Sequence, residues 1–368
     1  MQASQHPVAT ESIGRSRDQI HMLTSQWRGL ELKVTESLNE AKDNVKYLTT
    51  LEKFIEPLYE GTPETIKDTL PALMNSIKMI HTIARYYNTN DKMTGLFIKI
   101  TTQMIQNCKN YILNFRKGKS NDKATQKNRR GGDQPDGKEL WDDQKYPPDE
   151  LIPVLKSCID LNNTYQKQYK LTKERLMSMP KGKQFEFSPN QIFGKFDLFC
   201  RRIAKLIDLF QTIKQFKTLS QHNLENIDPI LKSFDGVQAK LKGQFHDLLA
   251  YTENTFDRDF VEFNVGVASV ETQLQAYIDK NFETIDSIED SLKLLRKFQT
   301  ILQRESLRNS LDSKYTILFY NYGNEIQSIE DQYQKQKSSP PIVRNLPTVA
   351  GSITWSRHLF HRISGPME

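Results

Sequence analysis

Apolar residues at a seven-residue spacing dominate the first part of the chain. One series begins at Ile20 and Trp27, and a second, three residues on, begins at Leu23 and Leu30. Two such series form one apolar stripe on a single long helix. The second series is interrupted twice, so the stripe drifts, as it does on a helix that packs against several neighbours. In full the series are Ile20, Trp27, Val34, Ala41, Leu48, Ile55 and Leu23, Leu30, Ser37, Asn44, Leu51, Leu58.

Helical spacing continues along most of the chain. The first helix is predicted from Ile13 to Ile55, where Pro57, Gly61 and Pro63 end it. A second is predicted over 66–87, with Pro71 at its start or at a kink, and a third over 93–115. Short connections between these three helices predict an antiparallel bundle. Further helices are expected over 151–179, 190–219, 227–250, 255–280, 285–303, 305–337 and 353–363, with Thr284 and Ser287 as N-caps.

Residues that break helices and make turns are scarce. The chain has only 16 Gly and 15 Pro among 368 residues, below the usual share of about 12% for the two together. Sandwiches, barrels and propellers need frequent turns, so the composition argues against them. The fold class expected is all-α, an elongated stack of consecutive antiparallel helical bundles.

Four parts follow from the pattern. Residues 1–115 form an N-terminal helical bundle, and residues 116–149 form a basic, disordered or loosely packed insertion. Residues 150–339 form further bundles, and residues 340–368 form a Pro-rich turn and the start of another bundle. The segment 338–351 is expected to be extended. The chain stops without a finished domain, which predicts a piece of a longer polypeptide.

The net charge of +6 is concentrated in one segment. Between Arg116 and Arg130 there are seven basic residues and one acid, so the rest of the chain is neutral. A nucleic-acid-binding domain spreads its basic residues over a folded face. We interpret this segment as a solvated loop; contact with an acidic surface is the alternative.

The cellular setting is read from three observations. No run of 18 apolar residues could span a membrane, and the N-terminus lacks the apolar core of a signal peptide. Cys108, Cys158 and Cys200 form no C-x-x-C pair and suit a reducing compartment, where they pack as small buried thiols. The expectation is a soluble intracellular protein.

No catalytic motif is complete. Gly118-Lys119-Ser120 repeats the end of a phosphate-binding loop, but Leu113 stands where the first Gly is required. His358 and His361 have metal-ligand spacing without a matching third ligand, so we interpret them as surface histidines. Asn162-Asn163-Thr164 is a chance glycosylation sequon in an unsecreted chain. The acids Asp257, Asp259 and Glu262 stand beside Arg258 and are interpreted as solvated helix faces.

Aromatic residues are plentiful on the predicted helices. They fill bundle cores or form partner surfaces, and we favour the cores. The clustered ones are Phe196, Phe199, Phe256, Phe260, Phe263, Tyr315, Phe319 and Tyr320. Periodicity and composition alone therefore indicate a helical scaffold.

Four sequence segments in the second half of the chain are more specific than a helical periodicity alone. They are IFGKFDLFCRRIAKL (192–206), DLLAYTENTFDRDFVEF (247–263), LLRKFQTIL (294–302) and PPIVRNLPTVAGSITWSRHLFHRI (340–363). They resemble the N-terminal tail region of dynein heavy chains. Arg344-Asn345, Pro347, Ala350-Gly351, Trp355 and Arg357 resemble axonemal more than cytoplasmic chains, and outer-arm more than inner-arm chains. Residues before 150 resemble this region more loosely, and 116–149 does not.

The resemblance implies a non-catalytic segment of a microtubule motor whose ATPase ring lies downstream. The resemblance assigns no catalytic, cofactor-binding or metal-binding residue in this sequence, and the partner-binding residues are unknown. ATP would belong to the motor domain. The implied partners are WD-repeat intermediate chains, light chains, other heavy chains and docking factors on the doublet microtubule, with no nucleic acid or membrane. The implied location is the axoneme of a cilium or flagellum, with assembly in the cytoplasm. The segment 340–351 and Trp355 would set the turn between bundles.

Two other functions remain open on the residues. One is a spectrin-like or tethering rod without a motor. The full-length chain of such a rod would lack a downstream phosphate-binding loop, whereas that of a dynein would contain one. The other is a protein that binds microtubules or nucleic acid through residues 116–130. Deletion of those residues would then abolish the binding and its salt dependence.

Overall fold

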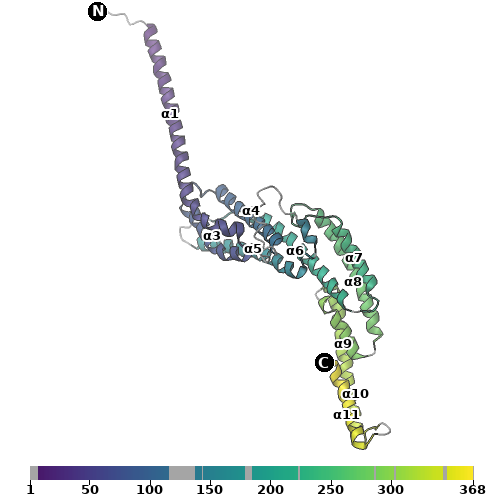
Figure 1. The fold of residues 1–368 in the computed structure, drawn as a ribbon. Helices are drawn as coiled ribbons and strands as arrows, with labels where there is room; N and C mark the ends of the chain where they lie inside the picture. Colours follow the sequence, from purple (N-terminus) through teal and green to yellow (C-terminus); the bar gives the residue numbers. More distant parts are fainter. Residues whose placement is uncertain are drawn as a thin grey trace, which may run out of the picture. The chain divides into compact units, whose positions relative to one another are not determined.

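The computed structural model describes residues 7–115, 137–142, 144–178, 185–222, 224–285, 287–301, 304–342 and 346–367. Over these ranges the only regular elements are helices, so the all-α prediction is confirmed (Figure 1). The chain divides into two compact units. Unit 1 comprises residues 1–135 and 153–204, and unit 2 comprises residues 136–152 and 205–368. The domain divisions expected from the sequence stay predictions. No helix of the described residues is long and apolar enough to cross a bilayer.

In the described residues, unit 1 is built from four α-helices, most of a fifth and part of a sixth. They are α1 (Pro7–Leu48), α2 (Ile55–Glu60), α3 (Pro63–Ile83), α4 (Asn90–Asn114), most of α5 (Pro148–Met177) and the first half of α6 (Pro189–Gln221), with a 3-10 turn, η1 (Thr49–Phe54), after α1.

The predicted first helix is wrong at its C-terminal end. It stops at Leu48, and a 3-10 turn and the short helix α2 follow. Pro57 lies inside α2, in its first turn, where its missing N–H costs nothing. The helix ends at Glu60, and its C-cap Gly61 donates its N–H to the Pro57 carbonyl at 3.0 Å.

The second predicted helix begins earlier than expected, at Pro63. The side chain of Thr62 caps it by accepting the N–H of Thr65 at 3.3 Å. Pro71 therefore lies in the interior of α3 rather than at its start. The helix also ends four residues before the predicted Tyr87, at Ile83, because Ala84 is extended.

An aromatic cluster fills the core of unit 1. Phe97 of α4 and Tyr169 of α5 meet edge-on at 5.6 Å between ring centroids. In the segment before α6, Phe185 packs against both rings, Phe187 packs against the ring of Phe97, and both phenylalanines are buried. The Phe187 N–H donates to the Tyr169 hydroxyl at 3.2 Å, which ties this segment to the core. Burial of the hydroxyl raises the pKa of Tyr169.

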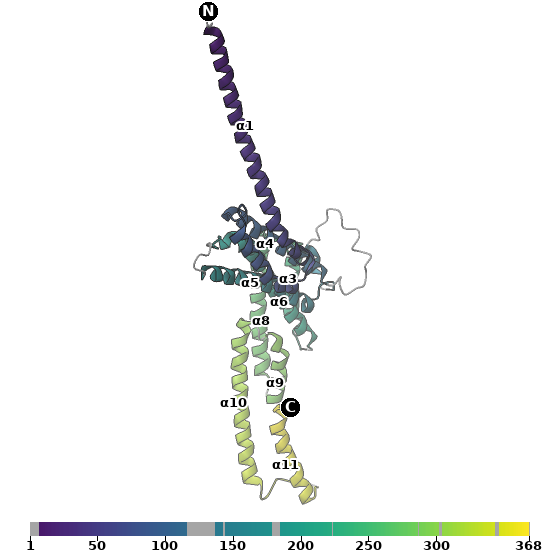
Figure 2. The same cartoon turned by 90° about the vertical axis from the view of Figure 1, so that its left-hand side faces the viewer.

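The predicted bundle of the first three helices is wrong. Helices α2, α3 and α4 pack on one another, but residues 19–39 of α1 are all exposed. Figures 1 and 2 show the first part of α1 without another described helix of unit 1 beside it. Attachment begins further along, where Glu40 pairs with Lys92 and the carboxylate of Asp43 accepts the N–H groups of Arg85 and Tyr86. The apolar stripe indicated that this helix packs against a partner, but it did not indicate which part of which chain supplies that partner.

Unit 2 begins with the second half of α6. It continues through α7 (Asp228–Lys242), α8 (Thr255–Glu283), α9 (Ile288–Lys297), α10 (Glu305–Gln336) and α11 (Thr348–Ser364), with 3-10 turns η2 (Gly137–Trp141), η3 (Gln299–Ile301) and η4 (Gly365–Met367). Helices α7 and α8 form a tight pair (Figure 1). At the crossing, Gly266 of α8 faces Val237 of α7 so closely that a Cβ on Gly266 would lie 2.8 Å from a Val237 methyl.

Helix α7 is shorter than the predicted 227–250. It ends at Lys242, and a tight loop follows in which Phe245 has a φ of 47°. Thr284, predicted as an N-cap, is the C-cap of α8, whereas Ser287 does cap α9 by accepting the Asp290 N–H.

The second part of the predicted loose insertion is packed. Its first part, 116–136, lies outside the described residues. Gly137, Leu140 and Tyr146 are buried. The Gly137 N–H donates to the Asp247 carboxylate at 3.0 Å, and the Trp141 indole N–H donates to the His246 carbonyl at 3.2 Å. Buried apolar side chains and donors with partners hold 137–149 to the loop after α7.

The predicted extended segment 338–351 is wrong at its end, because α11 begins at Thr348. Figure 2 shows α10 and α11 side by side. Trp355 stacks on Tyr333 with 6.0 Å between ring centroids, and Arg362 pairs with Glu325.

Candidate interaction site

The candidate site is the heptad stripe on the first part of α1, which we call the α1 seam. It comprises Ile20, Leu23, Trp27, Leu30 and Val34, whose side chains are between 58% and 66% exposed. Single exposed apolar residues are common on protein surfaces, but a contiguous series at three- and four-residue spacing marks a binding surface.

The seam and the attached part of α1 differ in sequence. The seam ends where Ser37 and Asn44 replace its apolar positions. Just beyond Ser37, Glu40 and Asp43 make the first contacts with the rest of unit 1. The intact heptad therefore coincides with the length of helix that unit 1 leaves uncovered.

Apolar residues also occur on other faces of this helix. Met22 and Leu32 are 55% and 63% exposed, but neither lies at a seam position. Their exposure and apolar character are similar to those of the seam residues, but they are not aligned with the heptad spacing.

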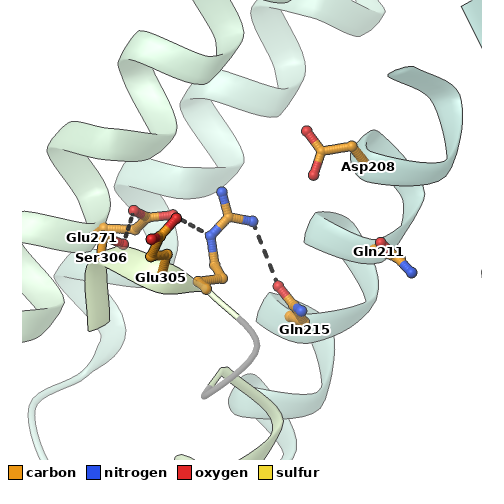
Figure 3. Close-up of a pocket in the computed structure, with 7 residues that line it drawn as sticks. Asp208, Gln211, Gln215, Glu271, Glu305 and Ser306 are labelled. Carbon is orange, nitrogen blue, oxygen red and sulfur yellow. Dashed lines mark hydrogen bonds and ion pairs between the residues drawn. The ribbon is translucent and has the colours of Figure 1, made fainter. Parts of the chain in front are cut away.

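A second feature is a polar cluster in unit 2, shown in Figure 3. Arg304, just before α10, pairs through Nε with Glu271 of α8. Its Nη1 donates to the Thr212 hydroxyl of α6 at 2.7 Å and reaches the Gln215 amide oxygen at 3.5 Å. The Ser306 hydroxyl donates to the second oxygen of Glu271.

A cavity of about 470 Å³ adjoins this cluster. Its lining is polar, and Glu271, the most buried of the acids that line it, is already occupied by Arg304 and Ser306. The lining residues are Asp208, Gln211, Gln215, Glu271, Arg304, Glu305 and Ser306. The carboxylate that accepts the Ser306 hydroxyl, Glu271, is also paired with Arg304, so we interpret the cluster as a polar joint between α6, α8 and the start of α10.

The motifs that suggested chemistry are not brought together into a site where they lie in the described part of the chain. His358 and His361 are exposed on α11, and among the described residues there is no group of three or more His, Cys, Asp or Glu able to hold a metal. Asn162 of the sequon is buried and donates to Asp197 at 2.8 Å, so it is inaccessible to glycosylation in the folded chain. Gly118-Lys119-Ser120 and the segment 116–130 lie outside the described residues.

The acids on α8 were expected to face solvent, and two of them instead contact basic side chains within unit 2. Asp257 pairs with Lys205 of α6 at 2.8 Å. Asp259 lies 2.6 Å from Nε2 of His246, in the loop after α7. Only Glu262 is exposed as predicted.

The cysteines are free thiols packed inside unit 1. Cys108 and Cys158 are fully buried, and Cys200 is half-buried. Contact with Cys158, together with burial, raises the pKa of Cys108, and burial raises the pKa of Cys200 to about 12. A thiol is nucleophilic only as the thiolate, so the raised pKa values of Cys108 and Cys200 disfavour their reaction as nucleophiles at neutral pH.

The aromatic residues divide between core and surface. Phe196, Phe199, Phe256, Phe260 and Phe263 are buried, which confirms the core interpretation for them. Tyr315 is half-buried. The interpretation is wrong for the next two, because α10 leaves Phe319 and Tyr320 at 66% and 70% exposure.

Comparison with known proteins identifies the family of this chain. Residues 11–368 match the family model for the dynein heavy chain, N-terminal region 1. The chain belongs to this family, in the N-terminal, non-motor part of the heavy chain. The resemblance predicted from 192–206 and 340–363 is thereby confirmed.

The relatives are axonemal heavy chains. The chain is 44% identical over 93% of its length to the dynein gamma chain of the flagellar outer arm of Chlamydomonas reinhardtii. It is 38% identical over 94% of its length to dynein axonemal heavy chain 5 of Mus musculus, and 34% identical over 94% to dynein axonemal heavy chain 8 of Homo sapiens. In each case it spans 7% of the relative's length.

Proposed function

We propose that this chain is a non-catalytic assembly segment of an outer-arm axonemal dynein heavy chain. In this role it joins the heavy chain to WD-repeat intermediate chains, light chains and other heavy chains, and it helps to anchor the motor to the doublet microtubule. The observation that carries the proposal is the match of nearly the whole chain to the N-terminal region of heavy chains, with 44% identity to an outer-arm chain.

The fold is suited to this work. Long helices joined by buried aromatic clusters and ion pairs resist bending, and a motor must pass force through its tail. The polar joint at Arg304 and the stacked pair Tyr333 and Trp355 each bind a helix to its neighbour within unit 2. Exposed apolar positions on α1 and α10 offer surface for partner proteins.

The proposal also covers the full-length heavy chain to which such a segment belongs. ATP would be bound by a motor domain outside this segment, so the segment itself would need no cofactor. The location would be the axoneme of a cilium or flagellum, preceded by assembly in the cytoplasm. Neither nucleic acid nor membrane is proposed as a partner.

The experiment is capture of axonemal proteins by the purified chain. The chain is immobilised, incubated with a ciliary extract at moderate salt, and the bound proteins are identified by mass spectrometry. A variant lacking residues 116–130 is run beside it to separate charge-driven capture from binding to the helices.

Recovery of WD-repeat intermediate chains or another heavy chain by both versions supports the proposal. Recovery of tubulin alone, lost in the deletion variant, contradicts it and favours direct microtubule binding through the basic segment. Recovery of neither also contradicts it, because the assembly surfaces would then lie elsewhere in the heavy chain.

A further inference from the structure

We propose that one face of α11 is a docking site for an amphipathic helix of a partner protein, and that this partner helix carries acidic residues along one flank. The face, which we call the α11 groove, is lined by Ser352, Ile353, Ser356, Arg357 and Phe360. The proposal does not depend on the axonemal assembly role, because it follows from the exposure, spacing and charge of residues in unit 2.

The α11 groove is hollow and bordered by exposed apolar side chains. Its volume is about 460 Å³. Ile353 and Phe360 are 54% and 62% exposed, and Val349, one turn before Ile353, is 74% exposed. Large apolar side chains that are exposed together, rather than singly, mark an interaction surface.

Helix α10 extends this apolar surface. Arg362 of α11 pairs with Glu325 of α10, so this pair marks the sides of the two helices that face each other. At about 100° per residue, Phe360 lies about 160° around α11 from Arg362, and Ile326 lies about 100° around α10 from Glu325. Because α10 and α11 run antiparallel, these rotations bring Ile326 and Phe360 to the same side of the pair. Ile326 is itself 37% exposed.

The spacing along α11 specifies a helix as the occupant of the groove. Val349, Ile353, Ser356 and Phe360 follow one another at intervals of four, three and four residues. Side chains at this spacing form holes that accept the side chains of another helix with a similar repeat. The small side chains of Ser352 and Ser356 let the backbone of that helix approach closely.

The charge of α11 specifies one flank of the partner helix. The basic residues of α11 are Arg357, His358, His361 and Arg362, and it contains no acidic residue. Arg362 is occupied by Glu325, whereas Arg357, which lines the groove, pairs with no acid of the described residues. A carboxylate on the partner helix that faces Arg357 would form a charge-assisted hydrogen bond with it.

The opposite flank of the partner helix is specified by repulsion. Glu330 of α10 is exposed and lies one turn after Ile326, on the same side of α10 as the groove. Acidic residues on the flank that faces Glu330 would meet a like charge, which is unfavourable. The occupant is therefore acidic on the flank beside Arg357 only, and this asymmetry sets the direction in which it lies in the groove.

The test is a titration of the chain with two synthetic helical peptides, followed by fluorescence anisotropy. Both peptides carry Leu at alternating three- and four-residue intervals; one has Glu along one flank, and the other has Lys at the same positions. The chain lacking residues 116–130 is titrated in parallel, because that basic segment could itself attract the acidic peptide.

A pair of variants tests whether the peptide binds in the groove. Ile353→Asp/Phe360→Asp places two charges in the groove. The control, Ile317→Asp/Tyr320→Asp, places the same charges at exposed apolar positions of α10 that do not line it. Circular dichroism checks that all variants are as helical as the wild type.

A second pair of variants tests the role of charge. Arg357→Glu reverses the charge in the groove. Its control is Lys335→Glu, at an exposed base that lines a different hollow, on α10.

We expect the acidic peptide to bind the wild type at least about 10-fold more tightly than the basic peptide, with or without residues 116–130. The groove variant should weaken this binding at least about 10-fold, and Arg357→Glu should reverse the preference between the peptides, whereas neither control should do so. The proposal is overturned if the acidic peptide does not bind or binds no more tightly than the basic one. It is also overturned if binding is lost with residues 116–130, or if the groove variant and its control weaken binding equally.

A lipid surface is the competing occupant, because a basic amphipathic helix can also lie on a membrane. Flotation of the chain with vesicles of neutral and anionic phospholipid tests this alternative. We expect any vesicle binding to be the same in the wild type, the groove variant and its control. Vesicle binding that only the groove variant loses would overturn the proposal of a protein partner.

Discussion

The guanidinium of Arg304 pairs with the carboxylate of Glu271 and so joins the start of α10 to the middle of α8. Both side chains are largely buried, at 18% and 9% exposure. Breaking such a pair leaves an uncompensated charge, which costs about 3 kcal/mol or more. We expect Arg304→Ala to lower the midpoint of the unfolding transition of unit 2, measured by urea titration with circular dichroism.

The control for this prediction is a second variant in which the charge is removed from both sides. Replacement of both residues by Leu is expected to recover most of the loss, because a buried ion pair is often no better than apolar packing. If Arg304→Ala is as stable as the wild type, the ion pair does not stabilise the contact between α8 and the start of α10.

A prediction about packing concerns the crossing of α7 and α8. Gly266→Ala would place a Cβ 2.8 Å from a Val237 methyl group, so either the Val237 side chain or the two helices must shift. We expect a loss of about 1 to 3 kcal/mol in the free energy of unfolding. Gly323→Ala, in α10, is the matched control, since a Cβ there would have no neighbour within 4 Å and helix propensity favours Ala by about 0.5 to 1 kcal/mol. Opposite signs for the two variants confirm the close crossing.

A third prediction is a loss of stability at alkaline pH. Burial raises the pKa of Cys200 from 9.0 to about 12, so the folded chain holds a proton that the unfolded chain releases. The contribution is complete below pH 9 and is lost as pH rises toward 12, with a slope of about 1.4 kcal/mol per pH unit for one group. Thermal unfolding between pH 8 and 11 measures it, and Cys200→Ala should reduce the slope. An unchanged slope in that variant would assign the effect to other groups, such as the buried tyrosines.

The parts of the fold that could be predicted are those with a local cause. The apolar spacing from Met93 to Phe115 matches α4 to within a few residues, because one face of that helix is buried along its length. Ser287 was predicted as a cap because its signal lies within one turn. Helix type and approximate bounds follow from such short-range patterns.

The parts that could not be predicted depend on residues far apart in the chain. Arg304 and Glu271 are 33 positions apart and belong to no motif, so nothing in the sequence pairs them. Phe185 and Phe187 lie in a loop, outside any periodic stripe, and yet complete the core of unit 1. The α1 seam shows the same limit, since an amphipathic stripe predicts that a partner exists but not which helix supplies it.

The last prediction concerns the attachment of α1 to unit 1. The carboxylate of Asp43 accepts the N–H groups of Arg85 at 2.9 Å and Tyr86 at 3.2 Å, just after α3 ends. Removing the acceptor leaves both donors to water and loosens the joint between α1 and α3. In Asp43→Ala we expect amide hydrogen exchange to accelerate at 84–87 while the core of α4 is unchanged. Glu36→Ala, at an exposed acid of α1, serves as the control. Unchanged exchange at Arg85 and Tyr86 would show that Ala84 and the end of α3, rather than Asp43, hold this turn in place.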